Sequence, residues 1–332
     1  MNTSLAREPL LQVKWLRTRF YIYGGALDAI DGVDLDVRNN ETVGLVGETG
    51  CGKSVTALSI MRLIQDPPGK IVSGSIVFKG EDLMTKSIDE MRAIRGAQIA
   101  MVFQKPMTSL NPTFRIGTQM ADVISLHNQL GEKEAWARSI DLLRSVQIAV
   151  PENVVKRYPH ELSGGMRQRV MIAIALSSNP DLLIADEPTT ALDATIQKQI
   201  LALIKDLREK FGFSMLFISH DLRTIYNVCD RIYVMYAGKI VEFGDIESVF
   251  NHPGHPYSHA LMNSLPRFDS KKDSLDAIPG TVPSLLYPPP GCRFHPRCAF
   301  ASKDCERETP IMRKIGEDHW VACFRVIEGE ST

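Results

Sequence analysis

The chain has 332 residues, 44% of them hydrophobic and 23% charged, which are ordinary values for a globular protein. Its 38 basic and 39 acidic residues give a net charge of −1, so nothing in the charge balance indicates a nucleic-acid partner. No apolar run approaches the ~18 residues that span a bilayer, and the N-terminus lacks the regions of a signal peptide. We therefore expect a cytoplasmic protein with one large core and an appendage, or two modest domains.

Two strands are predicted before residue 40. Residues 10–14 form a short apolar run, and residues 30–37 alternate between apolar and polar side chains. Between them lies an aromatic loop that contains Phe20, Tyr21 and Tyr23. Such side chains usually pack at a sheet edge, but a flat apolar ring can also stack on an adenine base.

A glycine-rich loop follows, and the rest of the chain is organised around it. Its residues fit GxxxxGK[ST] and are Gly47, Glu48, Thr49, Gly50, Cys51, Gly52, Lys53 and Ser54. The loop lies between the apolar run 42–46 and a predicted helix that begins at Val55, which is the context this motif needs. Its backbone N–H groups, the helix N-terminus and the Lys53 ammonium would surround a phosphate, and Ser54 is placed to bind Mg²⁺. The pattern predicts binding of a nucleoside triphosphate.

The middle of the chain changes character twice. Strands are predicted over residues 74–80 and 98–103, and the second runs into Gln104 and a polar turn at 105–112. Residues 113–180 are then predicted to be helical, with apolar side chains at helical spacing at Trp136, Ile140 and Leu143. A helical insertion therefore interrupts an α/β pattern.

The α/β pattern resumes with a buried strand at 182–185, which ends at Asp186 and Glu187. Carboxylates at the carboxyl end of a parallel strand lie where open α/β sheets bind ligands. A helix with regular apolar spacing follows, at Ile196, Ile200, Leu203, Leu207 and Phe211. A strand at 214–219 then leads to His220. These repeated units predict a mainly parallel sheet in a three-layer α/β core.

The end of the chain is a proline-rich appendage that is too small for an ordinary core, which favours a metal staple. It contains Cys292, Cys298, Cys305 and Cys323. In a reducing compartment, clustered thiols indicate a metal site more than disulfides. Their spacing lacks the close CxxC pairs of structural zinc sites, whereas an iron–sulfur cube tolerates wider spacing. An iron–sulfur cluster, zinc, and no metal or an adventitious disulfide all remain open.

Five features in one order give the chain its family resemblance. They are the phosphate loop, Gln104, the LSGG motif at 162–165, the strand and turn at 182–193, and Ser219-His220-Asp221. Together they resemble the nucleotide-binding subunit of ABC transporters, and the LSGG motif discriminates because other P-loop NTPases lack it. The resemblance implies an ABC-type core at 1–265 with an antiparallel N-terminal β subdomain and a helical subdomain at about 113–180, followed by an extension at 266–332.

Further segments resemble one branch of that family. Residues 254–261, 278–283 and 291–298 are similar to the C-terminal region of dipeptide/oligopeptide importer ATPases, as is the stretch 101–112. Nickel and opine importers share much of this pattern and are the alternative. Similar tails in this branch carry a 4Fe-4S cluster, so the resemblance implies that the four tail cysteines bind one, with zinc as the runner-up. Its role could be structural or redox-sensing.

The resemblance also implies roles around the nucleotide. ATP would be held by the loop, and Mg²⁺ by Ser54 and Gln104, with Asp186 acting through water. Lys53 and the loop amides would supply the positive charge that phosphoryl transfer needs. Glu187 would be the general base or water-polarising carboxylate, and His220 would lie near the γ-phosphate.

Phe20 aligns best with the adenine-stacking aromatic residue of the family, and Tyr21 and Tyr23 are close alternatives.

The LSGG motif has a consequence for assembly. Ser163, Gly164 and Gly165 are predicted to open a helix, whose N-terminus is a second anion site. In the family this motif covers the ATP of a partner subunit, with Asp193 at the seam. The resemblance therefore implies a dimer with a second, similar ATPase, two transmembrane permease subunits contacted beside Gln104, and an extracytoplasmic solute-binding protein. The chain would lie on the cytoplasmic face of the inner membrane.

Two functions from other classes compete with this interpretation. A soluble ABC ATPase acting on ribosomes or DNA would usually carry two cassettes, long coiled coils or basic patches. A redox sensor with a secondary ATPase is the other possibility, and the presence of both Glu187 and His220 argues against it.

Overall fold

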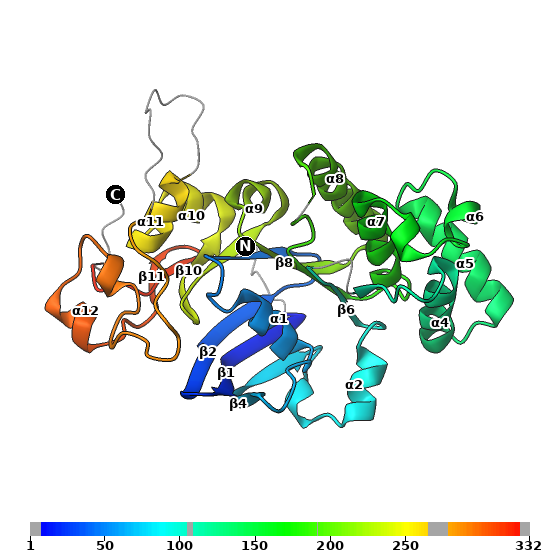
Figure 1. The fold of residues 1–332 in the computed structure, drawn as a ribbon. Helices are drawn as coiled ribbons and strands as arrows, with labels where there is room; N and C mark the ends of the chain where they lie inside the picture. The colour runs from blue at the N-terminus through cyan, green and yellow to red at the C-terminus, as the bar shows by residue number, and fades with distance from the viewer. Residues whose placement is uncertain (1–7, 105–108, 191, 265–277, 326–332) are drawn as a thin grey trace, which may run out of the picture. The chain divides into compact units, whose positions relative to one another are not determined.

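The computed structural model describes residues 8–104, 109–190, 192–264 and 278–325 (Figure 1). The chain divides into two compact units. Unit 1 comprises residues 1–37, 42–84 and 218–332, and unit 2 comprises residues 38–41 and 85–217.

Two sequence predictions fall on residues that the structure does not describe. The boundary predicted between residues 265 and 266 lies within the undescribed residues 265–277. Residues 105–108, which belong to the predicted turn and to the stretch 101–112, are also not described.

Unit 1 contains the predicted antiparallel N-terminal sheet. Its order is β2-β1-β4-β5, with β1 (Leu11–Ile22), β2 (Gly25–Val37), β4 (Gly69–Phe78) and β5 (Glu81–Asp82). The prediction of an aromatic loop is wrong for Phe20 and Tyr21, which pair with Leu27 and Ala26 across a hairpin. Aromatic side chains favour strands, and only Tyr23 lies in the turn, followed by Gly24 with a φ of 101°.

The second sheet of unit 1 mixes parallel and antiparallel pairs. Its order is β11-β12-β10-β9-β3, with β3 (Thr42–Val46), β9 (Arg231–Tyr236), β10 (Lys239–Asp245), β11 (Arg313–Gly316) and β12 (His319–Val321). Strands β3 and β9 run parallel, whereas β9, β10, β12 and β11 follow one another antiparallel. The prediction of a mainly parallel sheet missed this antiparallel part, since short strands give little periodicity to detect.

Short helices accompany these strands in unit 1. They are α1 (Lys53–Ile60), α9 (Leu222–Val228), α10 (Ile246–Asn251), α11 (Pro256–Asn263), α12 (Lys303–Arg307) and the 3₁₀ turn η3 (His295–Arg297), and η1 (Leu83–Thr85) crosses into unit 2. Among all described residues, no helix combines the length and the apolar character needed to cross a bilayer.

Unit 2 joins three buried strands to a helical region. The strands are in the order β8-β7-β6, with β6 (Ile99–Val102) parallel to β7 (Leu182–Asp186) and β8 (Ser214–Ser219) ending in unit 1. The helices are α2 (Ile88–Ile94), α4 (Ile116–Asn128), α5 (Glu132–Ser145), α6 (Pro151–Val154), η2 (Pro159–Glu161), α7 (Gly164–Ala175) and α8 (Ala194–Phe211). Helices α4 to α7 gather in the predicted helical region, drawn in green (Figure 1).

The buried faces of two long helices test the periodicity argument. In α8 the predicted Ile200, Leu203 and Leu207 are buried, and so is Ile204, which was not predicted. The predicted Ile196 and Phe211, at the ends of the helix, are half-buried. In α5 they are Ala135, Ser139, Leu142 and Leu143, so the buried face is offset from the predicted one. Trp136 instead covers Gly117 of α4, where a Cβ would lie 2.6 Å from its ring.

A buried carboxylate ties the C-terminal part of unit 1 to β10. Glu242 is fully buried, and its Oε1 accepts a hydrogen bond from Gly254 N at 2.7 Å while its Oε2 accepts one from His255 N at 2.9 Å. His319 Nε2, on β12, lies 2.6 Å from Glu242 Oε1. One side chain therefore fixes the start of α11 and the position of β12.

Replacing Glu242 by Gln should destabilise the protein by about 3 kcal/mol, because an amide N–H₂ would then face N–H donors at a fully buried site. Urea denaturation at pH 7, followed by circular dichroism, measures the effect. Glu247→Gln, on the exposed side of α10, is the matched control and should change stability by less than about 0.5 kcal/mol. Equal stability of the two variants would contradict the role assigned to Glu242.

Candidate functional site

The phosphate loop packs closely against neighbouring backbone, which explains why Gly47 and Gly52 are glycines. A Cβ on Gly47 would lie 2.1 Å from Met235 O at the end of β9, and a Cβ on Gly52 would lie 2.7 Å from Ala29 O. Gly52 also has a φ of 113°, in the left-handed region that disfavours other residues. The loop backbone can follow its path only with glycine at these positions.

Lys53 is the buried cation of this loop. Lys53 is only 5% exposed, and its Nζ donates to Gly47 O at 2.7 Å and to Glu48 O at 3.1 Å. It is also the first residue of α1, whose N-cap Gly52 offers no side-chain hydrogen bond and whose first turn contains no acid. The helix N-terminus and the ammonium together form a site that favours an anion.

The remaining loop residues differ in exposure, and two of the loop amides already have partners, since Glu48 N donates to Tyr257 OH and Cys51 N donates to Glu48 O. Thr49 and Gly50 are exposed, and Ser54 and Val55 are half-buried. Burial raises the pKa of the Cys51 thiol, so this side chain is a neutral packing group near Lys53.

Unit 2 brings two of the predicted site side chains together. Gln104 Nε2 donates to Glu187 Oε2 at 2.7 Å, and Thr190 Oγ1 donates to the same oxygen at 2.8 Å. Glu187 is 8% exposed and has a φ of 47°, a left-handed conformation that is costly for a glutamate. Such strain concentrates at functional sites. Asp186 precedes it at the end of β7 and is 5% exposed.

Two helix N-termini in unit 2 carry the other predicted positions. Ser163 is the N-cap of α7, which starts at Gly164, and its Oγ accepts a hydrogen bond from Met166 N at 3.3 Å. The first turn of α7, which includes Gly165, contains no acid. Asp193 is the N-cap of α8. The prediction that the LSGG motif opens a helix is confirmed.

The aromatic candidates lie on the β1–β2 hairpin with different exposure. Phe20 is half-buried against Gly69, where a Cβ would lie 2.7 Å from its ring. Tyr21 is 54% exposed and Tyr23 is fully exposed at the turn. His220 follows β8 and is exposed.

The four tail cysteines line one cavity of unit 1, although they come from separate segments. All four are free thiols, and Cys292 N donates a hydrogen bond to Cys305 O at 2.8 Å. Burial raises the pKa of Cys292 to about 11, and it also raises the pKa values of Cys298 and Cys323. The cavity is otherwise lined largely by apolar side chains, among them Phe294, Phe300 and Phe324.

These cysteines do not form a site for a single ion. Among the described residues, no group of three or more His, Cys, Asp or Glu side chains is arranged to hold one metal ion. This finding supports neither the expected 4Fe-4S cluster nor the zinc alternative.

Two residues for which no sequence motif indicated this role, Tyr257 and Arg297, contact the phosphate loop. Glu48 N donates to Tyr257 OH at 2.9 Å, and the Glu48 carboxylate pairs with Arg297 Nη1 at 2.7 Å. Arg297 adjoins Cys298 in a segment that the sequence had singled out, but no local pattern identifies a partner 249 residues away.

Comparison with known proteins agrees with this geometry. Residues 30–190 match the family described as "ABC transporter", and residues 241–305 match "Oligopeptide/dipeptide transporter, C-terminal region". The solved dimeric cassette MJ0796 bound to ADP and Pi is 26% identical, with a TM-score of 0.64, over 71% of this chain and 98% of that one.

Close relatives cover almost the whole chain. The oligopeptide transport ATP-binding protein OppD of Bacillus subtilis is 50% identical over 94% of this chain and 87% of its own length. The probable peptide ABC transporter ATP-binding protein y4tR of Sinorhizobium fredii is 48% identical over 98% of this chain and 97% of its own length. The dipeptide transport ATP-binding protein DppD of B. subtilis is 46% identical over 96% and 95%. The chain is therefore an ABC-type ATPase that belongs to the family of ATP-binding proteins of peptide ABC transporters.

Proposed function

We propose that this chain is the ATP-hydrolysing subunit of an importer that takes up di- and oligopeptides across the cytoplasmic membrane. The names of its relatives support peptides over the nickel or opine alternative. The match of residues 241–305 to an oligopeptide/dipeptide transporter region adds to that support.

ATP and Mg²⁺ are the cofactors of this reaction. Lys53 and the amides at the start of α1 bind the phosphates, since a buried ammonium is stabilised by a full negative charge. Ser54 and Gln104 bind Mg²⁺, with Asp186 acting through water. Mg²⁺ supplies charge neutralisation between the phosphates.

Glu187 polarises the attacking water, and His220 contacts the γ-phosphate. The buried and backbone-strained position of Glu187 supports a functional role. Its hydrogen bond from Gln104 links the proposed base to the proposed Mg²⁺ ligand. Phe20 stacks on the adenine, with Tyr21 and Tyr23 as the alternatives.

One observation supports the dimer: the phosphate loop opens α1 and the LSGG motif opens α7, so two separate motifs each place a helix N-terminus where a phosphate could bind. Neither first turn contains an acid. Ser163, Gly164 and Gly165 of one subunit then cover ATP bound to the loop of the other, and Asp193 lies at the seam. The dimeric state of the MJ0796 cassette supports this arrangement.

The dimer is a two-state switch that the γ-phosphate closes and hydrolysis opens. Its motion is transmitted beside Gln104 to two transmembrane permease subunits. We infer that the second ATPase is a similar but different chain, that an extracytoplasmic protein delivers the solute, and that this chain lies on the cytoplasmic face of the inner membrane.

The C-terminal lobe, which is the described residues 278–325, binds a 4Fe-4S cluster through Cys292, Cys298, Cys305 and Cys323. Four free thiols lining one largely apolar cavity suit this group, and four thiolates are its usual ligands. In such a cluster each thiolate would hold a different iron, so the four sulfurs would not need to converge on one point. When bound, the cluster cross-links segments of a lobe that is too small for an ordinary core.

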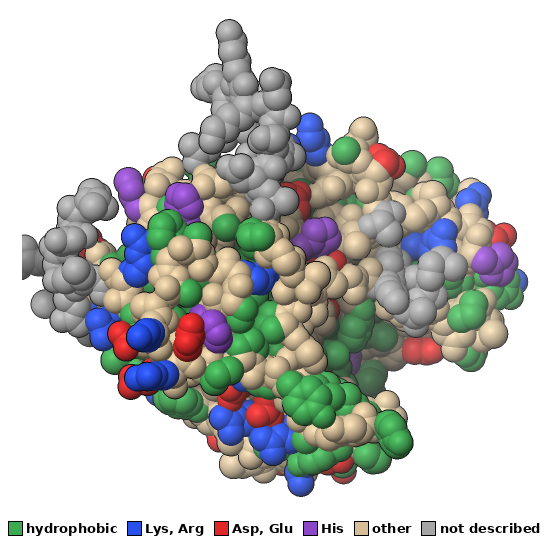
Figure 2. Space-filling view, turned by 60° about the vertical axis from the view of Figure 1, so that its left-hand side comes forward, with side chains coloured by type: hydrophobic (Ala, Val, Ile, Leu, Met, Phe, Trp, Pro, Cys, Tyr) green, Lys and Arg blue, Asp and Glu red, His purple; other side chains and the backbone are tan. Residues whose placement is uncertain are grey.

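The soluble alternative that acts on nucleic acid has less support. Figure 2 shows Lys and Arg side chains lying beside Asp and Glu side chains on one face of the molecule. A nucleic-acid interface would instead gather basic side chains into one patch.

Glu187→Gln should retain ATP binding and ATP-dependent dimerisation but hydrolyse ATP at least about 100-fold more slowly, because a general base contributes that much or more. Phosphate release by the assembled transporter and size-exclusion chromatography with ATP measure the two properties. Glu209→Gln, on the exposed side of α8, is the control. Turnover near the wild-type rate would remove Glu187 from its proposed role.

Anaerobically purified wild-type protein should be brown and hold about four iron atoms. Cys298→Ser should lose most of the iron and lower the thermal stability, because one ligand is missing. Iron analysis and absorbance measure these effects. The control is Cys229→Ala, which replaces the buried cysteine at the C-cap of α9. Iron-free wild-type protein made with ample iron would contradict the cluster.

Detergent extracts should yield this chain together with two multi-span permease subunits and a second, similar ATPase. Native mass spectrometry of the purified complex identifies these chains, the bound iron and any trapped solute together. Recovery of this chain only with ribosomes would overturn the importer function.

A further inference from the structure

The Cys292–Cys298 segment connects the cysteine cavity to the nucleotide elements of unit 1. Two of the four cysteines form its ends, and Arg293, Phe294 and Arg297 lie between them. Each of these three side chains makes a contact outside the C-terminal lobe.

Arg297 holds the phosphate loop through Glu48. Its Nη1 donates to Glu48 Oε2 at 2.7 Å and its Nη2 donates to Glu48 Oε1 at 3.1 Å, which is a bidentate ion pair. The Arg297 side chain is only 5% exposed and that of Glu48 is 28% exposed. The arginine is itself fixed, because its Nε donates to Pro279 O at 2.7 Å. Bidentate, shielded pairs of this kind fix position as well as adding energy.

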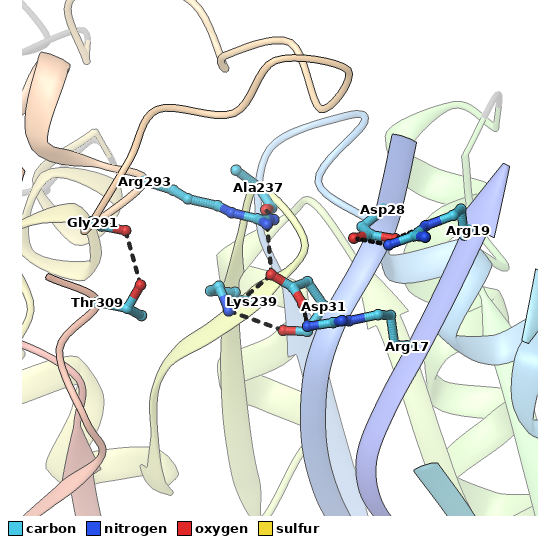
Figure 3. A network of polar contacts seen from close by, with 9 residues as sticks. All are labelled: Arg17, Arg19, Asp28, Asp31, Ala237, Lys239, Gly291, Arg293 and Thr309. Atoms are coloured by element: carbon cyan, nitrogen blue, oxygen red, sulfur yellow. Dashed lines mark hydrogen bonds and ion pairs between the residues drawn. The ribbon is translucent and has the colours of Figure 1, made fainter. Parts of the chain in front are cut away.

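Arg293 makes a second connection (Figure 3). Its Nη2 donates to Asp31 Oδ2 at 2.7 Å, and its Nη1 donates to Ala237 O. The next residue, Gly238, donates its N–H to Cys51 O of the phosphate loop at 2.8 Å. Arg293 therefore supports the turn on which the loop rests.

Phe294, which lies between these two arginines in the sequence, packs in an aromatic cluster. It is 3% exposed, and its ring centroid lies 5.1 Å from that of Tyr236 and 5.4 Å from that of Tyr257. Tyr257 OH accepts the hydrogen bond from Glu48 N. The segment thus reaches Glu48 at both its carboxylate and its backbone.

We propose that Arg297 is a positioning residue for the phosphate loop, and that the Cys292–Cys298 segment makes ATP affinity depend on the state of the four-cysteine lobe. The proposal rests on the proposed function, which assigns ATP to the loop and a cluster to the cysteines. When both end cysteines are bound, the short segment holds its arginines in place. When they are released, the backbone that carries Arg297 gains freedom and the loop loses its support.

Titration of the full-length protein with an ATP analogue carrying a fluorescent group on the ribose tests the first part. Arg297→Met should weaken binding roughly tenfold, within the usual range of coupling between sites, while the iron content stays at the wild-type level. Glu48→Gln should weaken it similarly, and the double variant no further, because both changes remove one interaction. Arg307→Met, an exposed arginine two residues from Cys305, is the control and should bind normally.

Arg297→Lys should restore part of the affinity, which a change in overall stability would not do. Wild-type affinity in Arg297→Met, or a double variant in which the two losses multiply, would overturn the role of Arg297.

A second double-mutant cycle tests whether nucleotide affinity depends on the state of the four-cysteine lobe. Cys298→Ser should weaken nucleotide binding in the wild-type background but not in the Arg297→Met background. Because coupling between binding free energies is reciprocal, the ATP analogue should also raise the amount of iron that wild-type protein retains at equilibrium with a chelator, but not the amount that Arg297→Met retains. Equal effects of Cys298→Ser in both backgrounds would refute the coupling. Iron-free wild-type protein would refute the cluster and this second part, while the Arg297–Glu48 cycle would still decide the first part.

Discussion

The buried ammonium of Lys53 constrains the phosphate loop and, through it, much of unit 1. It is 5% exposed and is held by two backbone carbonyls, which carry only partial charge. A buried full charge is costly unless an opposite full charge approaches it. The loop therefore favours an anion. Glycine is required at positions 47 and 52, because Met235 O and Ala29 O leave no room for a Cβ there.

Unit 2 contains a comparable constraint at the end of β7. Glu187 keeps an unfavourable backbone conformation while its carboxylate accepts hydrogen bonds from Gln104 and Thr190. Ser163 and Asp193 act as N-caps of α7 and α8, so both side chains stabilise a helix whether or not a partner subunit is bound. Their structural role and the proposed role at a dimer interface use the same atoms, since an N-terminus that needs capping also attracts phosphate.

The C-terminal lobe is small, and three buried charges attach it to the rest of unit 1. Glu242 fixes the start of α11 and the strand β12, while Arg293 and Arg297 reach Asp31 and Glu48. Burial would raise the pKa of Asp31, but Lys239, Arg293 and Arg17 hold it below its usual value, so this carboxylate stays charged. Arg293 and Arg297 lie between Cys292 and Cys298, so the proposed coupling links the folding of the lobe to the geometry of the phosphate loop.

The sequence by itself determined the features that depend on neighbouring residues. The strand–loop–helix around Lys53, the opening of α7 at Ser163 and the buried face of α8 follow from motifs and from helical spacing, and all three are present. Only the tertiary structure decided the strand pairing of Phe20 and Tyr21, the antiparallel strands β9 to β12, the gathering of four cysteines at one cavity and the Arg297–Glu48 pair. These features join residues far apart in the chain, and the free energy that selects them comes from packing and burial, which no local pattern records.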